Sequence, residues 1–114
     1  MTTVFVARDQ HGVCKLQVSG HSGYAASGRD IVCAAASVLI TTCANALESV
    51  AAISPLVSVN EARAEFAVAL PRSLPAQNEH DARVILSATL QGFSDLAVQY
   101  PKFIQINDGR TSSC

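Results

Sequence analysis

Two stretches with helical periodicity, separated by short alternating segments, constrain most strongly what this chain can fold into. The first covers residues 31–52, and the second carries an apolar stripe over residues 82–100. Pro55 and Pro101 follow them and end the helical pattern. Apolar residues that recur every three or four positions gather on one helix face, so both stretches predict amphipathic helices. Two such helices must bury their apolar faces against another layer.

The alternating segments provide that layer. Five of them are rich in β-branched or aromatic residues, and four form two pairs that are each joined by a turn, which predicts two β-hairpins and a final strand. These segments are residues 3–8, 13–19, 56–59, 64–70 and 102–107. The order ββαββαβ predicts an α+β fold with two layers, a mostly antiparallel five-stranded sheet with two helices packed on it. A sheet face left uncovered is then open to a second subunit.

Polar residues mark where each helix is expected to begin. Asp30 precedes the first helix and can accept hydrogen bonds from the free amides of its first turn. Asn78 is the expected cap of the second helix, with Glu79 and Asp81 placed in the first turn to complement the helix dipole. Asn60 and Glu61 are expected to form the turn of the second hairpin.

Length, composition and charge limit the class of protein. The 114 residues predict one domain over residues 1–109, followed by a flexible tail over residues 110–114. The net charge of −1 argues against a dedicated nucleic-acid binder, which usually carries a basic surplus. We also expect no membrane span and no signal peptide, since no long apolar run or charged leader is evident, and hence a cytoplasmic location.

Four cysteines are present, and none belongs to a CxxC pair. A reducing compartment keeps thiols free, so no disulfide is expected. Cys14 alternates with outward-facing residues and is predicted to lie in the core, while Cys43 falls in the middle of the first helix and is predicted to serve packing. Cys114 is expected to be incidental in the tail. Cys33 is the thiol whose position suggests chemistry.

If Asp30 caps the first helix, Cys33 is the third helical residue, where the dipole favours a thiolate. His21 ends the second strand, and a glycine- and serine-rich loop over residues 22–29 separates it from the helix. An imidazole beside a thiolate is the pair that a nucleophilic cysteine requires. Amides near Cys33 are expected to bind a developing oxyanion, and Ser37 lies one turn further on the same helix face.

The run from Gly20 to Ser37, GHSGYAASGRDIVCAAAS, resembles the signature of the ribosomal-processing cysteine proteases, the Prp family. About nine positions match at fixed spacing, and the length and element order extend the resemblance over essentially the whole chain. Ser22 and Ala36 depart from the family pattern, which bears on substrate preference more than on activity.

The resemblance implies a catalytic dyad of His21 and Cys33. It implies supporting or substrate-binding roles for Gly20, Asp30 and Ser37. The expected mobile loop that orders over a bound peptide includes Ser22, Gly23, Gly28 and Arg29.

The resemblance also implies a narrow activity. Such an endopeptidase removes the N-terminal extension of large-subunit ribosomal protein twenty-seven during ribosome maturation, cutting after paired aromatic residues. It is expected to be a homodimer that uses no cofactor and no metal, and to recognise a peptide without direct contact to nucleic acid or membrane.

Other readings of the same residues remain open. Without the motif, Cys33 is a small buried hydrophobe, and Asp30 either only caps the helix or also orients His21. A metal site would have His21 and Cys33 as ligands and Asp30 as a third, whereas zinc takes three or four well-spaced ligands and Cys43 is too far away. A redox sensor built on Cys33 would need a resolving cysteine nearby. The alternative of another class is a non-catalytic ribosome-assembly or protein-binding module with the same fold.

Overall fold

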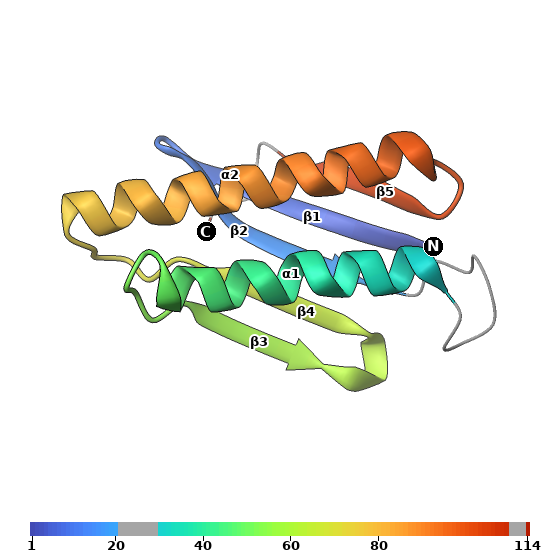
Figure 1. The fold of residues 1–114 in the computed structure, drawn as a ribbon, viewed down its shortest axis with the longest axis horizontal. Helices are drawn as coiled ribbons and strands as arrows, with labels where there is room; N and C mark the ends of the chain where they lie inside the picture. The colour runs from blue at the N-terminus through green and yellow to red at the C-terminus, as the bar shows by residue number, and fades with distance from the viewer. Residues whose placement is uncertain (21–29, 110–113) are drawn as a thin grey trace.

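The structure, a computed structural model, describes residues 1–20, 30–109 and 114. One five-stranded sheet carries both long helices on the same face (Figure 1). The elements in chain order are β1 (Thr2–Asp9), β2 (Gly12–Ser19), α1 (Ile31–Ser49), β3 (Leu56–Asn60), the 3-10 helix η1 (Glu61–Arg63), β4 (Glu65–Ala69), α2 (Ala76–Gln99) and β5 (Ile104–Asp108). The predicted α+β class and the order ββαββαβ are therefore confirmed, with η1 as an addition.

The strands lie side by side in the order β3-β4-β2-β1-β5. The pairs β1–β2, β2–β4 and β3–β4 are antiparallel, and β5 runs parallel to β1. The parallel pair arises because α2 carries the chain back along the sheet before β5 begins. β3 and β5 are the two edges, which leaves β4, β2 and β1 in the interior of the sheet.

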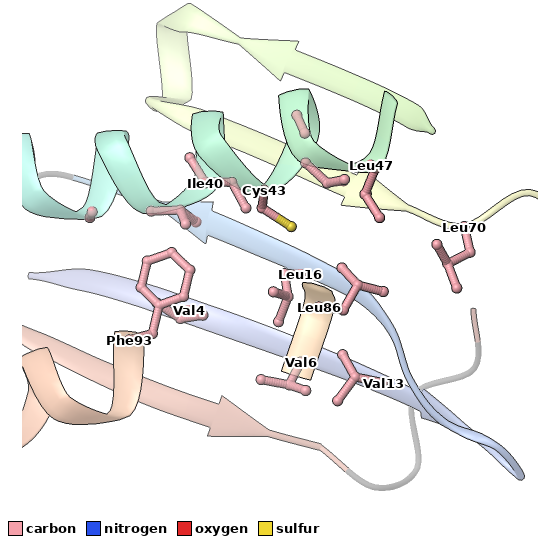
Figure 2. Close-up of a cluster of buried hydrophobic side chains, with 14 of the residues drawn as sticks. Val4, Val6, Val13, Leu16, Ile40, Cys43, Leu47, Leu70, Leu86 and Phe93 are labelled. Carbon is pink, nitrogen blue, oxygen red and sulfur yellow. The ribbon is translucent and has the colours of Figure 1, made fainter. Parts of the chain in front are cut away.

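Aliphatic side chains from both layers form the core (Figure 2). Val4, Val6 and Leu16 rise from the two central strands and meet Leu86 and Phe93 from α2. All five are at most 2% exposed. Burying side chains of this size contributes about 1.5–3 kcal/mol each, which makes this layer the main source of stability.

Helix α1 is long and apolar enough, by length and composition, to cross a membrane. Length and composition alone do not make α1 a membrane span, so the expectation of no span stays a prediction. The core helix of a globular protein passes the same test, and here α1 packs on β4 and β2 and buries one face that includes Val32, Ile40 and Leu47. The helix ends at Ser49, before the expected end near Ala52, because Ala52 adopts a left-handed conformation with φ of 57°.

The start of α2 also differs from the prediction. The helix begins at Ala76 with Pro75 as its N-cap residue, so Asn78 lies within its first turn and does not cap it. The Asn78 side-chain amide donates instead to the carbonyl oxygen of Ala51 at 3.0 Å. This hydrogen bond connects the start of α2 to the segment that follows α1, and no local sequence pattern predicts it.

The second hairpin is closed by η1 in place of a simple turn at Asn60 and Glu61. The Asn60 side-chain oxygen accepts from the backbone N–H of Arg63 at 3.2 Å and caps this short helix. Ala64 then adopts a left-handed conformation with φ of 49°, and its N–H donates to the Glu61 carbonyl. A short helical turn therefore joins the ends of β3 and β4 (Figure 1).

The structure pairs Cys14 with Cys114 in a disulfide, with 6.0 Å between their Cα atoms. This contradicts the expectation that all four thiols are free and that Cys114 is incidental. Cys14 is buried in β2 as predicted, yet it lies where the end of the chain can reach its sulfur. Cys33 and Cys43 are free.

Candidate active site

Cys33 occupies the third position of α1, as the sequence predicts, and its side chain is half-buried. The helix begins where it does because Asp30 caps it. The Asp30 Oδ1 atom accepts from the backbone N–H groups of Val32 and Cys33, both at 3.0 Å. This carboxylate satisfies two amides that would otherwise lack an acceptor and holds the first turn that carries the thiol.

The same contacts correct one expectation about the site. The N–H of Ala34 donates to the Asp30 carbonyl at 3.0 Å, and those of Val32 and Cys33 already donate to the Asp30 carboxylate. Three amides around the thiol are thus occupied and are not poised to stabilise an oxyanion. Asp30 acts as the predicted cap. The prediction that it also orients His21 concerns a residue outside the described part of the chain.

A cleft of about 260 Å³ opens beside Cys33. One wall is the face of α1 that includes Cys33, Ser37 and Thr41, whose spacing of four residues places them in one row along the helix. The opposite wall is the far end of the β3–β4 hairpin. The hairpin residues that line the cleft are Val59, Asn60, Glu61, Ala64, Glu65 and Phe66. The lining is completed by Thr2 of β1, Val18 of β2 and Gly20, which directly follows β2.

Gly20 connects β2 to this cleft in a conformation that suits glycine. Its φ is +83°, and its N–H donates to the carbonyl of Ala64 at 3.1 Å. Its own carbonyl accepts from the hydroxyl of Thr2 at 3.3 Å. Thr2 is only 1% exposed, so this hydroxyl is held inside the protein. These bonds fix the last described residue before the segment that contains His21.

Substituting Gly20 tests how much that fixed position matters. A Cβ atom at Gly20 would lie 2.8 Å from the backbone oxygen of Met1, so Gly20→Ala forces the chain to shift. We expect a loss of about 1–3 kcal/mol in the free energy of unfolding, measured by urea denaturation. Gly12→Ala is the matched control, because Gly12 also has a positive φ but a Cβ there meets nothing within 4 Å. Equal losses in the two variants would show that the contact with Met1 carries no weight.

Part of the predicted site lies outside the described residues. His21, Ser22, Gly23, Gly28 and Arg29 all belong to the segment 21–29. The structure brings Gly20, Cys33 and Ser37 to one cleft and places Asp30 immediately beside it in the helix cap. The predicted roles of these residues in catalysis stay predictions.

The Cys43 thiol is buried away from the cleft that contains Cys33. It is 1% exposed in the core between the helices and the sheet (Figure 2). Burial raises the pKa of its thiol, with a smaller opposing effect from a hydrogen bond to Thr89. The thiol therefore stays protonated and serves packing, as predicted.

The wall that the β3–β4 hairpin supplies was missed by sequence reasoning. Phe66 alternates toward the core and Val59 belongs to a short strand, but neither pattern indicates that this hairpin lies opposite Cys33. The lining role of Thr2 carries no sequence signal either. Only the strand order, which places β4 beside β2, brings these residues to the thiol.

Comparison with known proteins agrees with this architecture. The chain is 22% identical over 95 residues to the ribosomal processing cysteine protease Prp of Bacillus subtilis strain 168, covering 83% of this chain and 85% of that one. A crystal structure of the ribosomal processing protease Prp from S. aureus with a covalently linked product peptide matches with a TM-score of 0.84 and 24% identity. That match covers 96% of this chain and all of the other.

A second solved structure, SMU.848 from Streptococcus mutans, matches with a TM-score of 0.83 and 25% identity over 97% of this chain and 96% of that one. The S. aureus match shows the shared fold. The family model described as cysteine protease Prp covers residues 1–105 of this chain. With that match over nearly its whole length, the chain belongs to the Prp family of cysteine proteases.

Proposed function

We propose that this protein is a cysteine endopeptidase in which Cys33 is the nucleophile and His21 the general base and acid. The observation that carries the proposal is the placement of Cys33 at the start of α1 on the wall of an apolar cleft. Gly20 lines the same cleft, and His21 is the next residue in the sequence.

The reaction follows from these roles. The Cys33 thiolate attacks the scissile carbonyl carbon, and the C–N bond breaks as the His21 imidazolium gives its proton to the leaving amine. A water molecule then attacks the thioester while His21 accepts one of its protons. The C–S bond breaks, which restores the thiolate–imidazolium pair and releases the new carboxylic acid, whose proton passes to the freed amine or to water. The donors that stabilise the oxyanion come from outside the amides that Asp30 occupies.

The substrate we propose is the N-terminal extension of large-subunit ribosomal protein twenty-seven, cut after paired aromatic residues. The cleft supports an apolar substrate, since Val18, Ile40, Val59 and Phe66 line it. The names of the relatives support ribosomal processing, and one solved S. aureus relative holds a substrate peptide. We further propose that the protein is a homodimer and that it acts in the cytoplasm. Sedimentation at working concentrations tests whether it is a dimer.

The test is cleavage of a synthetic peptide that spans this extension as encoded in the same genome. We expect one cut, after the aromatic pair, read by mass spectrometry of the products. Replacing both aromatic residues by alanine should reduce kcat/KM by about 100-fold or more, because two large apolar groups lose their burial. Equal cleavage of the two peptides would contradict the aromatic specificity, and cleavage of neither would contradict the substrate.

A protein-binding module is the second candidate, favoured by one observation: the backbone N–H groups of Val32, Cys33 and Ala34 beside the thiol already donate to Asp30 and are not available to an oxyanion. Binding of the unaltered peptide without any cleavage would support that candidate.

A further inference from the structure

Strand β3 is an edge of the sheet with no charged residue in its sequence LVSVN, and it is exposed along its whole length. Natural edge strands are usually protected by charges, prolines or a covering element. Val57 pairs with the buried Val68, and Val59 pairs with Phe66, which packs against the core. Directly opposed residues share a sheet face, so Val57 and Val59 point toward the helix layer.

These two valines are nevertheless 47% and 57% exposed. The reason is that α1 packs over β4 and β2, and β3 extends beyond it (Figure 1). The far end of β3 lies toward the N-terminal end of α1 in the same view. Val57 and Val59 thus form an open apolar surface on the helix side of the sheet, and its Val59 end lines the cleft that holds the thiol.

The helix side of this groove has a defined length. Cys33, Ser37 and Thr41 follow one another at intervals of four residues, and all three line the cleft together with Val59. Eight residues of α-helix rise about 12 Å. An extended chain rises about 3.3 Å per residue, so this row spans about four residues of a bound peptide.

We propose that this groove, with Cys33, Ser37 and Thr41 on one side and Val57 and Val59 on the other, binds the substrate as an extended chain. It holds about four residues on one side of the scissile bond, and their apolar side chains pack on the two valines. The inference rests on the proposed peptidase activity and extends its recognition well beyond the residues that flank the cut.

A peptide fits this groove better than a second copy of the protein. The groove is continuous with the nucleophile, since Val59 and Cys33 line one cleft. An exposed edge of five residues is short for a standard interface, which buries roughly 800 Å² per partner. Apart from Glu61 and Glu65 at the hairpin end, the side chains that line the cleft are uncharged, which suits a peptide whose residues along Val59 are apolar.

The experiment combines Val59→Lys with peptides of different length. Val59→Lys places a charge in the groove, and Ser58→Lys is the matched control, since Ser58 is a neighbour on the same exposed strand and points to the other face. The substrates are the peptide of the ribosomal-protein extension and two series trimmed step by step from either end. All kcat/KM values are measured at the same protein concentration.

For the full peptide we expect Val59→Lys to lower kcat/KM at least about tenfold, mostly through KM, while Ser58→Lys stays within about twofold of wild type. Trimming the peptide at one end to within two residues of the cut should lower kcat/KM of the wild-type protein. With this short peptide, Val59→Lys and wild type should have equal kcat/KM. Thr41→Lys should behave like Val59→Lys, with Thr42→Lys as its control, because Thr42 is also exposed on α1 but does not line the cleft.

The inference is overturned if Val59→Lys leaves the full peptide unaffected or slows long and short peptides equally. A change in sedimentation with unchanged length dependence would also overturn it, because it would make β3 an interface between copies. Failure of the proposed function looks different, since wild-type protein would then cleave no peptide. In that case the dissociation constants of the long and trimmed peptides, measured with Cys33→Ala, still decide whether the groove binds an extended chain.

Discussion

Cys33→Ala is expected to abolish peptide cleavage, with kcat/KM falling by at least about 10⁴-fold. Alanine removes the atom that forms the covalent bond to the substrate in the proposed mechanism. The side chain is only half-buried at the start of α1, so its removal should leave folding and peptide binding nearly unchanged. Product formation is measured by mass spectrometry, and binding by calorimetry with the uncleaved peptide.

Cys43→Ala is the matched control for the nucleophile. It also removes a free thiol from α1, but from the core, so it should reduce stability while cleavage stays at the wild-type order of magnitude. Full activity in Cys33→Ala would end the assignment. Loss of wild-type activity on treatment with a chelator would favour instead a metal site that includes Cys33 and Asp30.

The second large effect concerns the Cys14–Cys114 disulfide. Oxidised protein is expected to exceed reduced protein by about 4–5 kcal/mol in the free energy of unfolding, because the bond closes a loop of 100 residues. Cross-linking so long a loop removes much of the entropy of the unfolded chain. Urea denaturation with and without a thiol reductant measures the difference.

Cys114→Ser separates this effect from other consequences of the reductant. Cys114 is exposed at the end of the chain, so its replacement costs little besides the bond. The variant should match reduced wild type under both conditions. Superimposable curves for wild-type protein with and without reductant, after mass spectrometry has verified the oxidised state, would show that the pairing contributes nothing.

The helices and strands were predictable because local periodicity carries them. Alternation in β2 and the period near 3.6 in α1 and α2 each report which face is buried. The Asp30 cap was predictable for the same reason, since it depends on residues within one turn. The placement of Cys33 as the third residue of α1 followed from that cap.

Two of the errors have the same physical cause, which is that contacts between distant segments override local signals. Asn78 has the chemistry of a cap, yet it donates to Ala51, 27 residues away. Cys114 has no patterned neighbours, and its pairing with Cys14 depends on where the last strand delivers the chain end. The predicted end of α1 near Ala52 failed because that residue turns left-handed.

The sequence by itself determined the two-layer class, the order of the elements and a thiol held at a capped helix start, because each depends on residues close together in the chain. Tertiary structure alone decided what faces that thiol. The strand order brings the β3–β4 hairpin beside α1 and leaves Val57 and Val59 uncovered next to the row that begins at Cys33. Strand pairing between segments about 50 residues apart is a global result of packing, and no local pattern encodes it.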